Sequence, residues 1–534
     1  MITDKRPTTH ITPPKPRSFT SLMRGAERTI ILLTIGILFY IAVFTTAAFF
    51  KYNSYLMGFD LAVHEQVIWN TAHGRIAETS AFANTNSYFG IDMIPFELLL
   101  APIYALWPST YTMLFLKTVT IGLGAIPVYL IVRDRWQSVW AGLVFAALLL
   151  LYLPVQYTNL YEFQIRAFAT TFLLWAFYAL ERRQFRAFLI WSLLALGCRS
   201  DVGLVLIGMG LYALYDERQR VFAWVRQPTT VRVSSPVFAF GLMPMVLGLG
   251  WFVLALEVLV PLFRDPNQPS LYLAVIYNQF GDSTGEIIRT VLTRPDYVLH
   301  YVFFSEQGPE RIRYLLGMFL PFAFLLLLQP RMLLITLPIF GLNLLSNTPH
   351  IHADIQKHYQ TLIVPFMVIG SAYGLHWLLG RLRAGARCHQ IALGGLVVLA
   401  LASNAGVFRV VIGDRGYVSP FLSLLTRDID HAKIAAIDDL LAQVPPDAAL
   451  TTSNKIGPYA AQRERIFFFP GNVIYPKEKI IQGDYLLLDH DNIPQDIRAQ
   501  LNGSEYTLEV GEGLQATYRR LAVEQEVSLW RKVE

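Results

Sequence analysis

The feature that most constrains this chain is a succession of apolar segments that begins at residue 29 and recurs as far as residue 412. The first segment, 29–50, has 22 residues. At about 1.5 Å per helical residue it reaches roughly 33 Å, which is enough to cross the hydrocarbon core of a bilayer. A cleaved signal peptide has a shorter apolar region, so we expect a retained membrane helix. The low share of charged residues, 16%, also favours lipid as the solvent, because soluble domains carry about a quarter.

Ten further segments are expected to cross the membrane, which gives about eleven spans. They are 110–132, 136–154, 166–181, 186–198, 202–215, 236–262, 313–329, 331–346, 360–380 and 390–412. Cytoplasmic loops carry an excess of Lys and Arg. Basic residues here fill the N-terminal tail, 1–28, and alternate connections, at 133–135, 181–186, 216–220 with Arg226 and Arg232, 329–331 and 381–387. The pattern predicts a cytoplasmic N-terminus and, after an odd number of spans, an extracytoplasmic C-terminus.

The fold class predicted is therefore an α-helical polytopic membrane protein with a small C-terminal α/β extracytoplasmic domain. The membrane domain covers 29–412, and its larger outer loops are 51–109, 155–165, 263–312 and 347–359. Residues 413–534 have the composition of a soluble domain. A helix is predicted at 428–444, before two prolines, and buried strands are predicted at 449–454, 465–470 and 484–489. No glycine-rich nucleotide-binding loop occurs in the sequence, and the net charge of +5 needs no nucleic-acid partner.

The first outer loop contains the first candidate site residues. The stretch 59–74 is predicted to form an amphipathic helix, with Trp69 as an interfacial anchor. Asp60 opens this helix, and His64 lies one turn later on the same face. Asp60 is interpreted either as a helix-capping residue or as a general base at the boundary between water and lipid. The sequence alone leaves both interpretations open.

Two further groups of charged residues border apolar segments. Glu162 either pairs with Arg166 four residues later or serves as a second acid that orients an acceptor or a metal. Arg199 either forms a salt bridge with Asp201 or binds a phosphate, since a guanidinium can contact two phosphate oxygens at once. Charges at such places pair internally or face a water-filled cavity. Farther along, Arg311 and Arg313 are expected to be anchors at the end of a span.

The last outer loop, 347–359, contains three histidines and an aspartate, which could bind a metal. Their spacing matches no zinc signature. Lys357, His358 and Tyr359 are alternatively interpreted as contacts to a lipid phosphate. The two cysteines, one in an apolar segment and one in a basic loop, are not expected to form a disulfide.

Several runs resemble a prokaryotic family of multi-spanning membrane proteins known as domain of unknown function two-zero-seven-nine, which is grouped with the GT-C glycosyltransferases. The runs are FDLAVHEQVIWNTAHGR (59–75), FGIDMIPFELLLAPIYAL (89–106), YTNLYEFQIRAFATTFLLWAFYALERR (157–183), LALGCRSDVGLVLIGMGLY (194–212), HYQTLIVPF (358–366) and, more weakly, DYLLLD (484–489). The resemblance covers nearly the whole chain. The chain departs from the family pattern at 162–166, at 199–201 and near Asp92.

The resemblance implies a sugar transferase that uses a polyprenyl-phosphate donor at the outer face of a prokaryotic plasma membrane. Asp60 then matches the catalytic base and Glu162 the second acid. Arg166, Arg199 or the 357–359 group would hold the donor phosphate, and His64 and Asp201 are further candidates for substrate binding. A divalent ion, Mg²⁺ or Mn²⁺, is a candidate cofactor, with Asp60, Glu162 and Asp92 as candidate ligands. The expected partners are membrane lipids, the donor, and a glycan, lipid or protein acceptor. A transporter and a non-catalytic scaffold that binds cell-envelope polymers are the alternatives.

Overall fold

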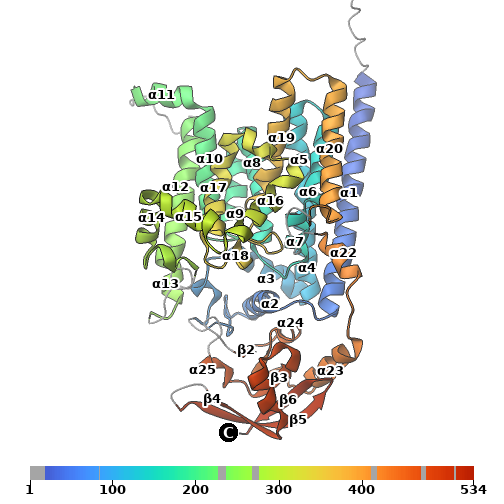
Figure 1. The fold of residues 1–534 in the computed structure, drawn as a ribbon, viewed down its shortest axis with the longest axis vertical. Helices are drawn as coiled ribbons and strands as arrows, with labels where there is room; N and C mark the ends of the chain where they lie inside the picture. The colour runs from blue at the N-terminus through green and yellow to red at the C-terminus, as the bar shows by residue number, and fades with distance from the viewer. Residues whose placement is uncertain are drawn as a thin grey trace, which may run out of the picture.

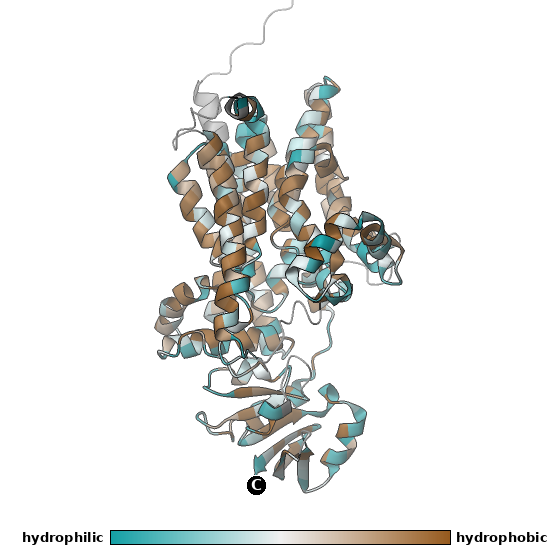
Figure 2. Cartoon of the chain, turned by 90° about the vertical axis from the view of Figure 1, so that its left-hand side faces the viewer, coloured by the Kyte–Doolittle hydropathy of each residue, from teal (hydrophilic) through white to brown (hydrophobic). Residues whose placement is uncertain are grey.

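The computed structural model of the chain has a long bundle of helices with a mixed helix and strand domain at one end (Figure 1). It describes residues 19–82, 85–226, 236–266, 276–409, 418–470, 477–509 and 513–533. Most of the expected basic tail, Arg232 and the expected domain boundary near residue 413 lie outside these residues. Apolar residues predominate along the bundle, and polar residues are frequent in the terminal domain (Figure 2).

The helical domain consists of elements between residues 19 and 425. They are α1 (Phe19–Asn53), α2 (Phe59–Ala72), η1 (Tyr88–Gly90), α3 (Phe96–Leu106), α4 (Thr110–Leu123), α5 (Ala125–Trp136), α6 (Val139–Leu151), α7 (Leu153–Leu160), α8 (Arg166–Glu181), α9 (Phe185–Leu196), α10 (Val202–Asp216), α11 (Arg218–Arg226), η3 (Val237–Leu242), α12 (Met243–Val253), η4 (Leu254–Leu259), α13 (Val260–Phe263), η6 (Asn278–Phe280), α14 (Thr284–Thr293), α15 (Pro295–Phe304), α16 (Gly308–Phe319), η7 (Leu320–Phe322), η8 (Leu325–Leu328), α17 (Pro330–Leu345), α18 (Pro349–His352), α19 (Val364–Arg381), α20 (Ala386–Asn404) and α22 (Pro420–Leu425).

Among the described residues, four helices are long and apolar enough to cross a membrane. They are Glu27–Asn53, Thr110–Trp136, Val237–Phe263 and Ala386–Asn404. The pair α6 and α7 makes a fifth if it counts as one span that is bent by 47°. Shorter apolar helices, among them α9, α10 and α17, lie between them. Most of the apolar segments therefore form helices as expected, whereas the count of eleven spans stays a prediction. The expected span 313–329 is interrupted instead, because Ala323 and Phe324 have a left-handed backbone between η7 and η8.

The basic connections are tied to one another at the end of the bundle that lies opposite the terminal domain. Arg183 contacts Glu217 at 2.7 Å, and Arg331 contacts Asp216 at 2.5 Å. These ion pairs join three connections that are far apart in the sequence. The connection between α19 and α20 lies at the same end as α11 and the first turns of α1 (Figure 1). Basic connections that are far apart in the sequence therefore lie together at one end of the bundle.

The C-terminal domain is built on a six-stranded mixed sheet in the order β2-β1-β3-β6-β5-β4. Its elements are α23 (His431–Leu441), β1 (Leu450–Ser453), α24 (Gly457–Ala460), β2 (Ile466–Phe469), α25 (Lys477–Ile480), β3 (Tyr485–Asp489), η9 (His490–Asn492), α26 (Gln495–Arg498), η10 (Ala499–Asn502), β4 (Glu505–Glu509), β5 (Gln515–Glu524) and β6 (Val527–Lys532). β1 pairs in parallel with β2 and β3, and the other pairings are antiparallel. The predicted helix and all three predicted strands are present. The strands form because each of the three apolar runs is long enough for one buried strand.

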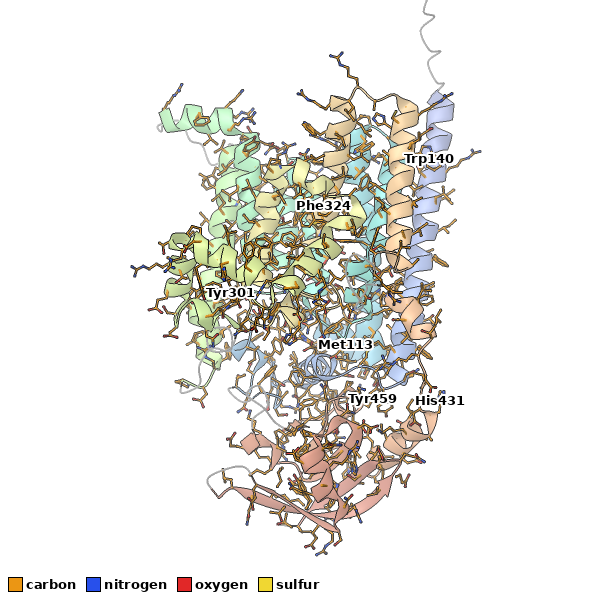
Figure 3. The ribbon with its side chains drawn as sticks, in the orientation of Figure 1. Met113, Trp140, Tyr301, Phe324, His431 and Tyr459 are labelled. Carbon is orange, nitrogen blue, oxygen red and sulfur yellow. The ribbon has the colours of Figure 1, made fainter. Side chains whose placement is uncertain are left out.

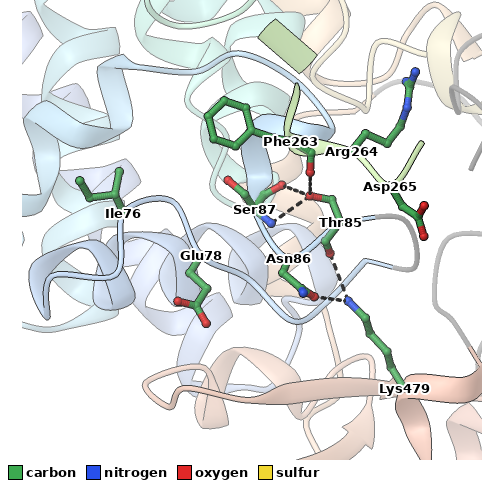
Figure 4. Close-up of a pocket in the computed structure, with 9 residues that line it drawn as sticks. All are labelled: Ile76, Glu78, Thr85, Asn86, Ser87, Phe263, Arg264, Asp265 and Lys479. Carbon is green, nitrogen blue, oxygen red and sulfur yellow. Dashed lines mark hydrogen bonds between the residues drawn. The ribbon is translucent and has the colours of Figure 1, made fainter. Parts of the chain in front are cut away.

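Lys479 connects this domain to the first outer loop of the helical domain. Its ammonium donates to the backbone oxygens of Phe82, at 2.7 Å, and Thr85, at 3.1 Å. It also donates to Oδ1 of Asn86, at 2.7 Å (Figure 4). Three acceptors saturate the three N–H groups of a lysine, so this contact fixes the loop against the sheet domain.

Two sequence interpretations are corrected by this packing. α2 forms where predicted, but residues on both of its faces, such as Val63 and Gln66, are buried, so it does not lie on the surface. It is enclosed because the C-terminal domain covers its outer side. Arg311 is not an exposed anchor either, since it is fully buried. Its guanidinium donates to the backbone oxygens of Leu344, at 2.7 Å, and Ser346, at 2.9 Å.

Candidate active site

The first two predicted acids meet at the N-terminus of α2. Oε2 of Glu162 accepts hydrogen bonds from the backbone N–H groups of Asp60, at 2.7 Å, and Leu61, at 3.2 Å. Glu162 therefore caps the helix that carries Asp60, because the first N–H groups of a helix have no partner within it. Gly58 precedes α2, and a Cβ atom there would lie 3.1 Å from Oε1 of Glu162. The capping function that the sequence offered to Asp60 is performed by Glu162, which leaves the Asp60 carboxylate for other contacts.

Tyr161 links this pair to the loop 347–359. Its hydroxyl donates to Oδ2 of Asp60 at 3.0 Å. The ammonium of Lys357 lies 5.6 Å from the centre of its ring, and the ring of His358 lies 5.2 Å away. Asp60 is part-buried, and so are Tyr161 and Lys357. Tyr161 therefore joins residues from three loops that are far apart in the sequence, 51–109, 155–165 and 347–359.

A second group of predicted residues surrounds Tyr359. The guanidinium groups of Arg166 and Arg199 lie 5.7 Å and 6.0 Å from the centre of its ring. Arg166 forms an ion pair with Asp201 at 2.8 Å, rather than the pair with Glu162 that the sequence suggested. Arg199 forms its shorter ion pair, 2.9 Å, with Asp92, and its contact with Asp201 is 3.7 Å. The two arginines are thus largely neutralised by two aspartates.

His64 faces a partner that sequence analysis missed. Its Nδ1 atom lies 2.9 Å from Oε1 of Glu97 on α3, and both side chains are almost fully buried. Burial lowers the pKa of His64, but the charge and hydrogen bond of Glu97 and the charge of Asp60 leave it raised overall. Glu97 lies in an apolar run, and a lone acid in such a run was the available signal.

The C-terminal domain also contributes to the site, which the sequence did not predict. Oδ1 of Asn454, directly after β1, accepts from the backbone N–H of Phe59 at 2.6 Å. Gln462 donates to Oε1 of Glu65 at 2.9 Å, one turn along α2. Tyr459 stacks on Tyr55 at 3.6 Å, where the two domains meet (Figure 3). Contacts from both domains therefore hold α2 in place. In the sequence, the polar residues that follow a predicted strand were the only local signal for the contacts from the C-terminal domain.

Burial changes the proton affinity of several of these groups. It raises the pKa of Glu162 to about 7, and the negative charge of Asp60 adds to the shift. Burial lowers the pKa of His358 well below its usual value, and the positive charges of Arg199 and Arg166 lower it further. Both effects disfavour the charged form of the His358 ring.

The residues named as candidate metal ligands do not all come together. Asp92 accepts from Oγ of Ser200 at 2.6 Å and pairs with Arg199, whereas Asp60 and Glu162 lie at the start of α2. Within the described parts of the chain, no three His, Cys, Asp or Glu side chains form a group that could hold a metal ion. The three carboxylates therefore do not fit a common divalent ion.

Solved structures with the same fold are known. ArnT from Cupriavidus metallidurans bound to undecaprenyl phosphate matches with a TM-score of 0.51 and 12% identity, over 94% of this chain and 97% of that chain. The apo state of the same protein matches with a TM-score of 0.51 and 14% identity, over 95% of this chain and 98% of that chain. Identity at this level shows a common fold alone. No curated protein matches.

The family described as "Predicted membrane protein (DUF2079)" matches residues 51–516. The matched region includes the whole candidate site and most of both domains. The chain belongs to this family of predicted membrane proteins.

Proposed function

We propose that this protein is a GT-C type glycosyltransferase that moves a sugar from a polyprenyl-phosphate donor to a hydroxyl acceptor at the outer face of a prokaryotic plasma membrane. The observation that carries the proposal is the carboxylate of Asp60, held by Tyr161 beside a helix N-terminus that Glu162 caps. The fold supports it, since ArnT has the same fold and has been solved with undecaprenyl phosphate bound.

In the proposed reaction Asp60 accepts the proton of the acceptor hydroxyl as that oxygen attacks the anomeric carbon. A new bond forms between this carbon and the acceptor oxygen. The bond to the phosphate oxygen breaks, and polyprenyl phosphate leaves with the electron pair. Attack from the face opposite the leaving group inverts the anomeric carbon. Tyr161 holds the carboxylate in place, and basic side chains of the site compensate the charge of the phosphate.

Each step uses side chains of this chain. The apolar helices would provide a surface for the polyprenyl tail. In this proposal the N-terminus is cytoplasmic, as the basic connections favour, and the site and the C-terminal domain lie on the other side of the membrane.

The proposal is tested by Asp60→Asn in membranes that are supplied with polyprenyl-phosphate sugars. An amide cannot accept the proton, so we expect transfer to fall by about 10²–10⁴-fold. Asp282→Asn is the matched control, because Asp282 is exposed in another outer loop. Unchanged transfer at normal protein levels would remove Asp60 from the mechanism.

A further inference from the structure

A cavity of about 410 Å³ lies where the end of α1 meets α7, α22 and the last outer loop. Figure 1 shows α22 beside α1, near the C-terminal domain. Lys51, Lys357 and Arg427 line the cavity, together with the polar side chains of Gln356 and Ser423. We refer to it as the basic cavity.

The three cations of the basic cavity are close to one another. Nζ of Lys51 donates to the backbone oxygen of Leu160 at 2.6 Å, which fixes its position. The charges of Lys357 and Arg427 are near enough to act on that of Lys51. None of the described residues that line the cavity has a carboxylate. Like charges gathered in this way repel one another, and an anion between them would relieve the repulsion.

Acids near this group compensate only part of its positive charge. Glu162 attracts Lys51, and its carboxylate also accepts hydrogen bonds from the backbone N–H groups of α2. Asp354, on the same loop as Lys357, accepts from the backbone N–H of Gln356 at 2.9 Å. The arginines around Tyr359 differ, because two aspartates balance their charge. The basic cavity is therefore the better place for a phosphate.

The basic cavity is also next to the candidate base. Tyr161 lines the cavity, has Lys357 over its ring, and donates its hydroxyl to Asp60. An anion in the cavity would thus be separated from the Asp60 carboxylate by one tyrosine side chain. The basic cavity is therefore adjacent to the residue that holds the candidate base.

A lipid has an apolar path to the basic cavity. α22 presents Leu422 and Leu425 outward, with exposed fractions of 45% and 67%. Leu424 of the same short helix lines the cavity. Apolar side chains at the surface of a membrane-associated helix fit an acyl or prenyl chain whose polar end reaches the neighbouring cations.

We propose that the basic cavity binds the phosphate group of the lipid substrate through Lys51, Lys357 and Arg427. The identity of that lipid as the sugar donor rests on the proposed function, whereas phosphate binding does not. In the donor, these cations would stabilise the phosphate as it leaves. The guanidinium of Arg427 contributes two donors, and the lysines act as point charges.

The test measures binding to the purified full-length protein by native mass spectrometry, with undecaprenyl phosphate and undecaprenol as probes. We expect undecaprenyl phosphate to bind at least about tenfold more tightly than undecaprenol. Loss of one charged hydrogen bond weakens binding by roughly tenfold. Arg427→Gln and Lys357→Gln should each weaken undecaprenyl phosphate binding by about that factor, and leave undecaprenol binding unchanged. Arg294→Gln, an exposed change of equal charge, should match the wild type.

Inorganic phosphate identifies the source of the recognised group. If free phosphate competes with undecaprenyl phosphate, and this competition is lost in Arg427→Gln, the cavity recognises the phosphate group alone. If free phosphate does not compete, the protein also holds the lipid by its tail. Equal binding of the two polyprenyl probes, or wild-type affinity in both variants, would overturn the proposal. Asp60→Asn should retain binding. Binding that depends on Arg427, with transfer unchanged in Asp60→Asn, would overturn the assigned catalytic role of Asp60 and leave the cavity intact. Binding that does not depend on Arg427, with transfer lost in Asp60→Asn, would overturn only the proposal for the basic cavity.

Discussion

At the scale of single residues, Gly58 determines whether two domains can meet at Asp60. A Cβ atom at this position would lie 2.6 Å from Oδ1 of Asn454, which must then move and release the N–H of Phe59. We expect Gly58→Ala to lose about 1 kcal/mol of stability, the usual cost of a lost helix cap, and to lower transfer. Asn454→Ala should have the same effect, and the double variant should add little, because both remove one contact. Gly36→Ala, where the space is open, is the control for thermal unfolding and activity. Additive losses would contradict the shared contact.

Also at the scale of single residues, Glu65 is expected to make the stability of the protein depend on pH. Burial raises its pKa to about 7, against hydrogen bonds from Thr110 and Gln462 that lower it. The folded state therefore holds this proton more tightly than the unfolded state, so its contribution to stability is present below about pH 4.5 and is lost as the pH rises toward 7. Glu65→Gln stays neutral and should flatten this part of the curve of melting temperature against pH. A wild-type curve that rises between pH 5 and 7 and does not change in Glu65→Gln would contradict this assignment.

At the scale of elements, Arg311 on α16 holds the end of α17. It also donates to Oγ of Ser305 at 2.9 Å, so it joins α16, α17 and the turn after α15. The last carbonyl groups of a helix lack partners within it. A lysine cannot reproduce the fork of donors, so Arg311→Lys should cost about 2–3 kcal/mol through unsatisfied carbonyl groups. Arg313→Lys is the control, since Arg313 donates only to Pro309 of its own helix among the described contacts. Equal melting temperatures for the two variants would show that the Arg311 contacts are replaceable.

At the scale of the whole molecule, the two ends of the bundle differ in a way that native Cys388 can report. It is exposed in the first turn of α20, at the end opposite the C-terminal domain, whereas Cys198 is buried. We expect a membrane-impermeant maleimide to leave Cys388 unlabelled in intact cells and to label it after permeabilisation. Lys455→Cys, at an exposed position in the C-terminal domain, should be labelled in both conditions. The opposite pattern would reverse the proposed orientation.

Strands β4, β5 and β6 were not predicted from the sequence. The sequence by itself determined the apolar helices, one helix and three strands of the C-terminal domain, and the loops that carry Asp60, Glu162 and Tyr359. These features depend on composition and on periodicity within a segment, which are local. The tertiary structure decided which residues of the site contact one another. Only it shows that Glu162 caps α2, that Arg166 turns to Asp201, and that Asn454 reaches Phe59. These contacts join residues far apart in the chain, and a buried charge takes whichever partner the packing brings to it, because leaving it unpaired costs more than abandoning a neighbour in sequence.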